Sequence, residues 1–321
     1  MSNMSSDNRL SFANVPQVLY ENRYCNQEGF SILACGGIDR NKKCLNQVLK
    51  VKVPSFEVID FISMKKPHCR LKLTSIDSDI FIADYYIRDV NLGNSCTSVE
   101  IYSEETKTWK HQYANFKERY GFCLCSFMGK LYIFGGYHKK EKESRFSCYI
   151  YDIRSDQSTE IADFCKARYW TACTVFEGKI VATGGISKSD YSHLKSVEAY
   201  DHLENKWTLL PDMNEKRMDH AAVSMGNKLF VIGGDRISSC EIFDSFSRKF
   251  TVINSEITVS AFEHNYFEAH CIGSNIVIFH HSQSYKSVIY MYDVNKLKWL
   301  TVDCSYTKDY FVPSCLKYYV Q

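Results

Sequence analysis

Apolar residues in this chain fall into short runs of four or five positions, and each run ends abruptly in small or polar residues. Runs of this length, rich in Ile, Val, Leu and Phe and bounded by glycine, are typical of buried strands rather than helices. Four of the runs are each followed directly by two glycines: 31–35 by Gly36–Gly37, 131–134 by Gly135–Gly136, 180–183 by Gly184–Gly185 and 229–232 by Gly233–Gly234. The pattern therefore predicts one type of strand ending, used repeatedly.

The glycine pairs recur at a fixed interval, which predicts an internal repeat. The step is 49 residues from Gly135 to Gly184 and again to Gly233, and from Gly36 to Gly135 it is 99, about two steps. Two further apolar runs, 80–83 and 276–279, fill the missing places, although polar residues follow them. The six units are thus registered at positions 36, 84, 135, 184, 233 and 280.

A second marker, an aromatic residue followed seven positions later by another large one, supports this register. The pairs are Tyr102 with Trp109, Tyr200 with Trp207, Phe243 with Phe250, and Tyr292 with Trp299; unit one offers Leu49 with Phe56, and unit three Tyr151 with Ser158. We expect these pairs to join the last two strands of each unit and to lie in the core.

Each unit reads as four short antiparallel strands, which cannot bury both faces of their sheet alone. Stacking six such sheets around an axis buries those faces and leaves only short edges exposed. The predicted fold is therefore an all-β, six-bladed propeller. Unit one lacks a first strand of the usual kind, and we expect residues 311–320 to supply it by pairing beside residues 29–35, which would close the ring.

The pattern resembles the Kelch repeat family, and in particular the propeller of kelch-like proteins, over roughly residues 28–321. Unit four is the fullest match, from Ile180 through Trp207 to Arg217, whereas units two and six lack the glycine pair. We expect residues 1–20 to form a loose N-terminal segment and residues 21–321 to form the propeller. The glycine pairs are assigned to backbone geometry, because no phosphate-loop Lys and helix start follow them.

The composition of the chain disfavours two classes of function and indicates a location. The chain has 39 Lys and Arg against 37 Asp and Glu, a balance that argues against a general nucleic-acid binder or a polybasic membrane anchor. Most of the 14 cysteines lie in apolar runs, as reduced, buried thiols do. With no signal peptide or membrane span in the sequence, we expect a cytoplasmic location.

One repeated polar feature suggests a binding site at the mouth of the propeller. Arg119, Arg168 and Arg217 stand 49 residues apart, each 16 before its glycine pair, and His68 and His264 share that offset. Kelch-like adaptor proteins hold target segments with such residues, so the resemblance implies an exposed ring of guanidiniums suited to an acidic segment. The alternative is that these arginines are ordinary exposed residues or brace their loops.

The loops near the glycine pairs provide further partner-binding candidates, because Tyr and Arg are enriched in interface hot spots; their alternative is ordinary solvated loop. These candidates are Tyr86, Arg88, Tyr137, His138, Tyr191, Arg236 and Tyr285. His280 and His281 are neighbours in one predicted strand and so point to opposite faces, which disfavours a shared metal. Cys123 and Cys125 share a face but lack a partner motif, and we expect core packing. We expect no cofactor.

The resemblance implies a protein-interaction module rather than an enzyme. The favoured function is substrate recognition related to cullin-dependent ubiquitin ligases. Because the first blade begins near residue 28, we expect no BTB and BACK domains before it. A ligase role would then need a separate partner, or the chain would be a truncated relative that competes for substrates. The alternative is binding to actin or another cytoskeletal protein. An enzyme, as in some Kelch propellers, is the remote alternative, because no convergent catalytic set can be assembled from the sequence.

Overall fold

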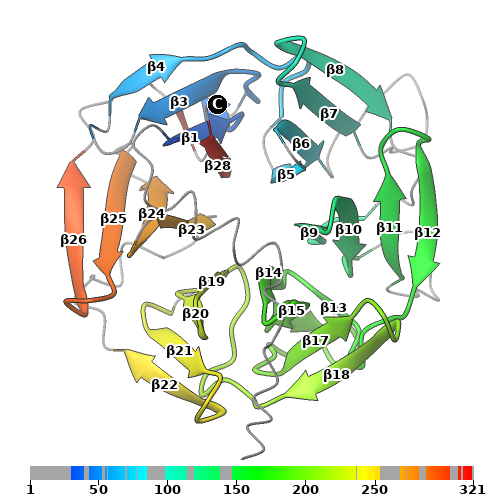
Figure 1. Ribbon diagram of the computed structural model, residues 1–321, viewed down its shortest axis with the longest axis vertical. Coiled ribbons are helices and arrows are strands. Elements are labelled where there is room, and N and C mark those ends of the chain that lie inside the picture. The colour runs from blue at the N-terminus through cyan, green and yellow to red at the C-terminus, as the bar shows by residue number, and fades with distance from the viewer. Residues whose placement is uncertain are drawn as a thin grey trace, which may run out of the picture.

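The computed structural model describes residues 30–39, 43–52, 55, 57–68, 71–76, 78–84, 98–113, 119–137, 147–235, 237–253, 268–272, 274–281, 287–303, 310–311 and 314–319. Within these residues the strands form six four-stranded antiparallel sheets, arranged as blades around a central axis (Figure 1), together with two small two-stranded sheets. The all-β, six-bladed propeller predicted from the repeat is confirmed. The predicted N-terminal segment, residues 1–20, lies outside the described residues.

The strands of the first three blades follow the order expected from the repeat. Blade 1 contains β1 (Phe30–Cys35), β3 (Val48–Lys52), β4 (Val58–Asp60) and β28 (Ser314–Tyr319). Blade 2 contains β5 (Leu71–Ile76), β6 (Asp79–Asp84), β7 (Ser98–Ser103) and β8 (Thr108–Tyr113). Blade 3 contains β9 (Cys123–Phe127), β10 (Lys130–Phe134), β11 (Cys148–Asp152) and β12 (Gln157–Ile161).

The second half of the ring repeats this arrangement. Blade 4 contains β14 (Ala172–Phe176), β15 (Lys179–Thr183), β17 (Val197–Asp201) and β18 (Lys206–Leu210). Blade 5 contains β19 (Ala221–Met225), β20 (Lys228–Ile232), β21 (Cys240–Asp244) and β22 (Lys249–Ile253). Blade 6 contains β23 (Glu268–Ile272), β24 (Asn275–His281), β25 (Ser287–Asp293) and β26 (Lys298–Asp303).

The aromatic pairs lie directly opposite one another across the two outer strands. Tyr200 faces Trp207 across β17 and β18, with ring centroids 5.2 Å apart. The predicted pairs of blades 2, 5 and 6 do the same, at centroid distances of 5.3, 5.0 and 5.0 Å: Tyr102–Trp109, Phe243–Phe250 and Tyr292–Trp299. A seven-residue spacing is therefore the signature of two strands joined by a short turn.

The prediction for unit one was wrong by two residues. In blade 1, Val51 stands opposite Val58, and Leu49 stands opposite Asp60. Phe56, the other predicted member, lies outside the described residues. Because this blade places an aliphatic Val51 where the others place an aromatic ring, the aromatic marker that aligned the other units was absent here.

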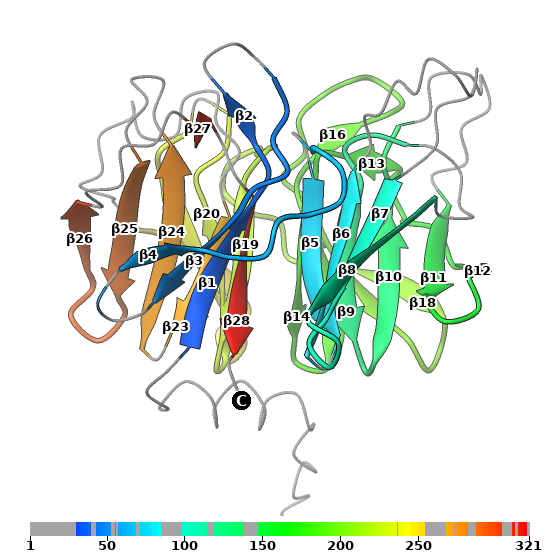
Figure 2. The same ribbon diagram turned by 90° about the horizontal axis from the view of Figure 1, so that it is seen from above.

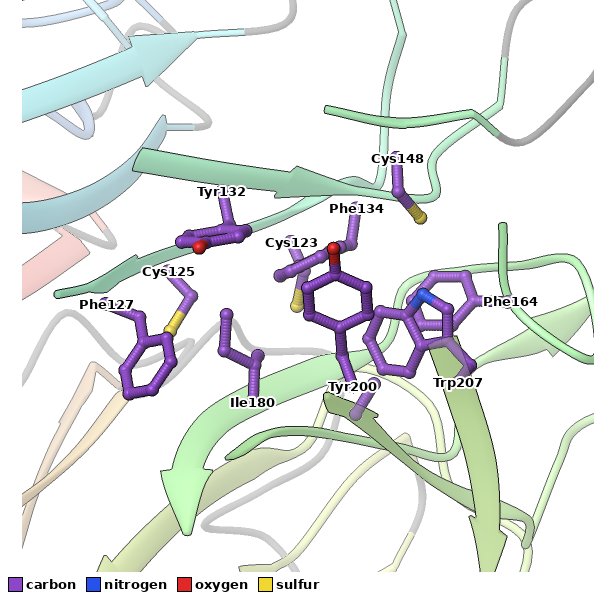
Figure 3. Close-up of a cluster of buried hydrophobic side chains, with 11 residues drawn as sticks. Cys123, Cys125, Phe127, Tyr132, Phe134, Cys148, Phe164, Ile180, Tyr200 and Trp207 are labelled. Carbon is purple, nitrogen blue, oxygen red and sulfur yellow. The ribbon is translucent and has the colours of Figure 1, made fainter. Parts of the chain in front are cut away.

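The core lies between neighbouring blades. Figure 3 shows the contact of blades 3 and 4, where Phe134 packs edge-on against Trp207 with centroids 5.1 Å apart. The indole Nε1 of Trp207 donates to the carbonyl of Ala162 at 2.9 Å, and Trp109 makes the equivalent bond to Ile62 at 2.7 Å. Trp109 and Trp207 thus fill the core and tie their blades to the connection that leaves the preceding blade.

The inner strands are linked by small hydrogen-bonding side chains. The innermost strand of a blade has a hydrogen-bonded neighbour in its own sheet on one side only. The carbonyls on its other side therefore need partners from outside the sheet. The thiol of Cys173 donates to Leu124 O at 3.5 Å, and the hydroxyl of Ser224 donates to Val175 O at 2.6 Å. Cys271 continues the series by donating to Ser224 O at 3.0 Å. These contacts explain why thiols and hydroxyls stand in otherwise apolar first strands.

The expected core role of Cys123 and Cys125 is confirmed, since both are buried in the cluster of Figure 3. Burial raises the pKa of the Cys123 thiol well above its ordinary value. Both thiols therefore behave as small apolar groups in this core.

The C-terminal strand lies beside the first one. β28 pairs antiparallel with β1, from Phe30 opposite Tyr319 to Cys35 opposite Ser314. At the end of the blades opposite the C-terminus, β2 (Ile38–Asp39) pairs with β27 (Tyr310–Phe311), and β13 (Arg168–Tyr169) pairs with β16 (Ile186–Ser187). Figure 2 shows both small sheets at this end, which we call the mouth face.

Candidate functional site at the mouth face

The three repeated arginines are buried, with relative exposures of 5% for Arg119 and 0% for Arg168 and Arg217. In each blade the guanidinium Nη1 donates to the first glycine carbonyl of the pair and to a serine carbonyl that precedes the third strand. For Arg168 these acceptors are Gly184 O at 2.9 Å and Ser196 O at 3.0 Å. The equivalent acceptors are Gly135 and Ser147 for Arg119, and Gly233 and Ser239 for Arg217.

The backbone at the same position joins adjacent blades. The second glycine of a pair donates its N–H to the carbonyl of the next blade's arginine, as Gly185 does to Arg217 O at 2.7 Å. Gly184, at φ +57°, approaches so closely that a Cβ there would lie 2.4 Å from that carbonyl. The glycine pair therefore permits a left-handed backbone in contact with the neighbouring blade.

We call the hydrogen bonds of each arginine, together with the group beside its guanidinium, the brace. Buried glutamates complete the brace in blades 4 and 5. Glu198 accepts from Arg168 Nη2 and from the backbone N–H groups of Cys165 and Lys166. Glu241 likewise accepts from Arg217, with 3.0 Å between Nη2 and Oε1. Burial lowers the pKa of Arg168, and the adjacent carboxylate raises it. Such a charge is tolerated inside because every strong donor there has an acceptor.

Blades 2 and 3 use variants of this brace. His68 is fully buried and lies 3.4 Å from the Glu100 carboxylate. In blade 3, Tyr149 occupies the register position of Glu198, and the Arg119 Cζ lies 4.8 Å from the Tyr149 ring centroid. The expectation that these arginines form an exposed ring was wrong, because their donors are directed into the blades, and the loop-bracing alternative describes them.

Four tyrosines from blades 3 and 4 gather at the mouth face instead, of which Tyr169 is buried, Tyr120 and Tyr137 are half-buried and Tyr191 is exposed. Tyr120 and Tyr137 have ring centroids 4.9 Å apart, and Tyr169 lies 5.8 Å from Tyr137 and 6.4 Å from Tyr120. Tyr191 acts electrostatically on Tyr120 and Tyr169, and its side chain is 61% exposed. We call Tyr120, Tyr137, Tyr169 and Tyr191 the tyrosine cluster.

Backbone contacts fix the base of this cluster. Tyr120 and Tyr137 exchange N–H···O bonds of 3.0 and 2.8 Å. Tyr169 lies in β13, opposite Ile186 of β16. Gly121 lies against Trp170, where an added Cβ would be 3.2 Å from the indole, and the Trp170 N–H donates to Gly121 O at 2.7 Å. The rings are therefore held in place before any partner arrives.

Burial and neighbouring phenols raise the pKa of two tyrosines of the cluster, Tyr120 and Tyr169. Burial, followed by the neighbouring phenols of Tyr137, Tyr169 and Tyr191, raises the pKa of Tyr120 to about 12. Burial also raises the pKa of Tyr169. The ammonium of Lys188 lies 4.9 Å from the Tyr137 ring centroid, within the range of a cation–π contact. The surface thus combines aromatic faces, hydroxyl groups and one cation.

Of the candidate residues predicted from the sequence, the structure brings Tyr137 and Tyr191 together in this cluster and places Arg119, Arg168, Arg217 and His68 in the interior. The remaining candidates lie outside the described residues: Tyr86, Arg88, His138, Arg236, His264 and Tyr285. Sequence reasoning missed Tyr120, Tyr169 and Lys188. A signal was present, since Tyr120 and Tyr169 each directly follow a repeated arginine.

The described part of the chain also bears on metal sites and membrane-spanning helices. No group of three or more His, Cys, Asp or Glu side chains there is arranged to hold a metal ion. His280 and His281 are consecutive in β24, opposite Val288 and Ser287. No described helix is long and apolar enough to cross a membrane.

Comparison with known proteins agrees with this architecture. A family model described as the KLHDC2/KLHL20/DRC7 Kelch-repeats domain matches residues 72–279, which is more than half of the chain. The chain belongs to the Kelch-repeat family. Kelch-like protein 38 from rat and from human is 41% identical over 56 residues, which is 17% of this chain and 10% of each relative. Kelch propellers are typically protein-binding modules and usually not enzymes.

Proposed function

We propose that this Kelch propeller binds a segment of a partner protein at its mouth face, with the tyrosine cluster as the main contact. The observation that carries the proposal is a set of four tyrosines from two blades, three of them packed ring against ring and the fourth, Tyr191, 61% exposed. Rigid aromatic side chains supply much contact area at low entropic cost, which is why Tyr is enriched in hot spots.

The cellular role that suits this proposal best is substrate recognition for a cullin-dependent ubiquitin ligase, in the cytoplasm. Support comes from family membership and from the partial similarity to Kelch-like protein 38. A cytoskeletal role, with actin as the partner, is the second candidate. The two differ in what the protein captures, because the first predicts ligase components or their substrates, and the second predicts co-sedimentation with filaments. Catalysis is not part of the proposal.

Affinity capture from cell lysate, read by mass spectrometry, tests the proposal. The wild-type chain is compared with a Tyr137→Ala, Tyr191→Ala variant and with Phe246→Ala as the control. Phe246 is 85% exposed and follows β21 at the end of blade 5 opposite its glycine pair. We expect partners that the double variant loses and the control keeps; the same partners in all three samples would place recognition elsewhere.

A further inference from the structure

Three large apolar side chains project from hairpin turns at the end of the propeller opposite the mouth face, which we call the far face. They are Leu203, Phe246 and Leu297, with exposed fractions of 84%, 85% and 65%. Each lies in the turn between the last two strands of its blade, in blades 4, 5 and 6 respectively. Figure 2 shows the β25–β26 turn at this end. The outer strands β18, β22 and β26 lie at the rim of successive blades (Figure 1), so the three turns are spread along the rim.

The turns of blades 4 and 5 do not require an apolar residue. In each, the aspartate that ends the third strand accepts a hydrogen bond from the N–H two residues later, which belongs to Leu203 and to Phe246, at 3.0 Å in both cases. Blades 3 and 6 form the same bond with polar residues at that position, Arg154 and Asn295. The exposed Leu and Phe are therefore explained neither by turn geometry nor by packing.

Leu297 holds a different position in its turn, where the backbone is left-handed at φ +52°. A positive φ is uncommon for residues other than glycine and favours Asn and Asp among them. In blades 2 to 5 the same position is held by polar residues: Lys107, Asp156, Asn205 and Arg248. A leucine that is 65% exposed here stabilises neither the turn nor the core.

Basic side chains surround the turns of blades 5 and 6. At the far face of these two blades, five described residues carry positive charge: Lys228, Arg248, Lys249, Lys296 and Lys298. Lys228 is half-buried and the other four are exposed. The acidic residues there are Asp244, which accepts from Ser247 N at 2.9 Å, and Asp293, which accepts from Lys296 N at 3.1 Å and pairs with its ammonium at 3.2 Å. The whole chain has 39 basic and 37 acidic residues, so this excess is local.

We propose that the far face of blades 5 and 6 binds the surface of an anionic lipid bilayer, with Phe246 and Leu297 entering the headgroup region. The neighbouring basic side chains would bind the anionic headgroups. An exposed Phe or Leu flanked by Lys and Arg is the combination that binds membrane interfaces. This surface is separate from the mouth face, so the inference goes beyond the function proposed above and does not rest on it.

The geometry favours a bilayer over a small molecule or a peptide. Sites for small ligands are concave, whereas these side chains project from the ends of hairpins. Turns that belong to separate blades but lie at one end can meet the same partner only if that partner is extended. An acidic protein would satisfy the lysines but would leave Phe246 and Leu297 without an apolar environment.

The test measures co-sedimentation of the purified chain with vesicles of phosphatidylcholine alone and of phosphatidylcholine mixed with phosphatidylserine. We expect wild type to bind the mixed vesicles and not the neutral ones, and binding to weaken as salt is raised. Phe246→Ser should weaken binding about fivefold or more, because an apolar side chain no longer enters the interface. The Lys249→Glu, Lys298→Glu variant should weaken it about tenfold or more.

Matched controls separate these effects from general changes in the surface. Leu209→Ser removes an apolar side chain of β18 that is 57% exposed and lies outside the turn. Lys166→Glu, Lys195→Glu reverses two exposed lysines near the start of β17, at the mouth end of blade 4, and changes the net charge as much as the far-face pair does. Both controls should bind the mixed vesicles as wild type does, and urea unfolding checks that every variant is folded.

Wild type that does not bind the mixed vesicles would overturn the inference. Equal losses in the two lysine variants would also overturn it, because the response would then be to net charge alone. Polyglutamate that competes with the vesicles and binds Phe246→Ser as tightly as wild type would assign the basic residues to an acidic protein instead. The Tyr137→Ala, Tyr191→Ala variant should keep vesicle binding and Phe246→Ala should keep the captured partners, so the two proposals fail separately.

Discussion

Blades 3 and 4 place the same arginine in the same position but complete its surroundings differently. Arg168 forms an ion pair with Glu198, and both side chains are fully buried. Arg119 makes the same carbonyl contacts but stacks on Tyr149. The shared part of the network, from guanidinium to two carbonyls, belongs to the fold. The part that varies is the group beside the guanidinium, which is a carboxylate in blade 4 and a tyrosine ring in blade 3.

The largest expected difference between blades 3 and 4 comes from removing their arginines one at a time. Arg168→Ala leaves the Glu198 charge buried and unpaired, so we expect a loss of about 3–5 kcal/mol in the free energy of unfolding. Arg119→Ala leaves no such carboxylate at the equivalent position, and we expect about 1–3 kcal/mol. Urea unfolding of the two variants measures the difference, and equal losses would show that Glu198 adds nothing to the brace.

Alanine substitutions at two glycines measure how tightly blades 4 and 5 are packed together. Gly184 and Gly226 both have φ +57°, but a Cβ at Gly184 would lie 2.4 Å from Arg217 O, whereas nothing lies within 4 Å at Gly226. We expect Gly184→Ala to cost about 2–4 kcal/mol and Gly226→Ala only about 1 kcal/mol, the cost of the left-handed backbone. Thermal or urea unfolding compares them. Similar costs would mean that the blades separate readily enough to admit the methyl group.

A buried histidine makes the brace between blades 4 and 5 sensitive to acid. His220 bonds to Thr183 Oγ1 at 2.7 Å, and burial, with Arg217 next in importance, lowers its pKa to about 3. Between about pH 6.5 and 3 the unfolded chain therefore binds a proton that the folded chain does not, so stability falls as pH falls. From pH 7 to pH 5 this contribution is about 2 kcal/mol.

The measurement for this prediction is the difference in unfolding free energy at pH 7 and pH 5 for wild type and for His220→Asn. The substitution removes one titrating group, so the variant should lose less stability than wild type on acidification, even if it is less stable at pH 7. The same loss in both proteins would assign the acid sensitivity to other groups.

The smallest expected effect on stability comes from making blade 3 resemble blade 4. Tyr149→Glu places a carboxylate beside Arg119, as Glu198 stands beside Arg168. We expect stability to change by no more than about 1–2 kcal/mol, because lost ring packing and a gained ion pair oppose each other. Urea unfolding compares this variant with wild type. A loss of stability as large as that expected for Arg168→Ala would show that blade 3 does not accept the carboxylate beside Arg119.

The sequence was sufficient for the fold because the repeat is marked twice, by glycine pairs and by aromatic pairs seven residues apart. A marker is missing where another residue type stands in its place. Blades 2 and 6 lack the glycine pair, and blade 1 has Val51 where other blades have an aromatic ring. The direction of the arginines was harder to predict, because a regular spacing looks the same for buried and exposed side chains. The deciding signal was a glutamate two residues before the aromatic marker: Glu100 before Tyr102, Glu198 before Tyr200 and Glu241 before Phe243.

The tyrosine cluster could be predicted only in part. Tyr137 and Tyr191 were selected because they stand in loops near glycine pairs, but their convergence depends on how blades 3 and 4 meet. The bridge of Tyr120 to Tyr137 and the β13–β16 sheet create that meeting, and two-residue pairings of this kind leave no periodic trace in a sequence. Lys188 was missed for the same reason.

Affinity capture with the Tyr137→Ala, Tyr191→Ala variant tests whether the arginines stabilise the blades and the tyrosines bind the partner. The capture is done once urea unfolding shows that the variant is folded. We expect near-wild-type stability, because Tyr191 is exposed and Tyr137 is only partly buried, together with loss of the captured partners. A stable variant that captures the same partners as wild type would contradict the role of the tyrosines.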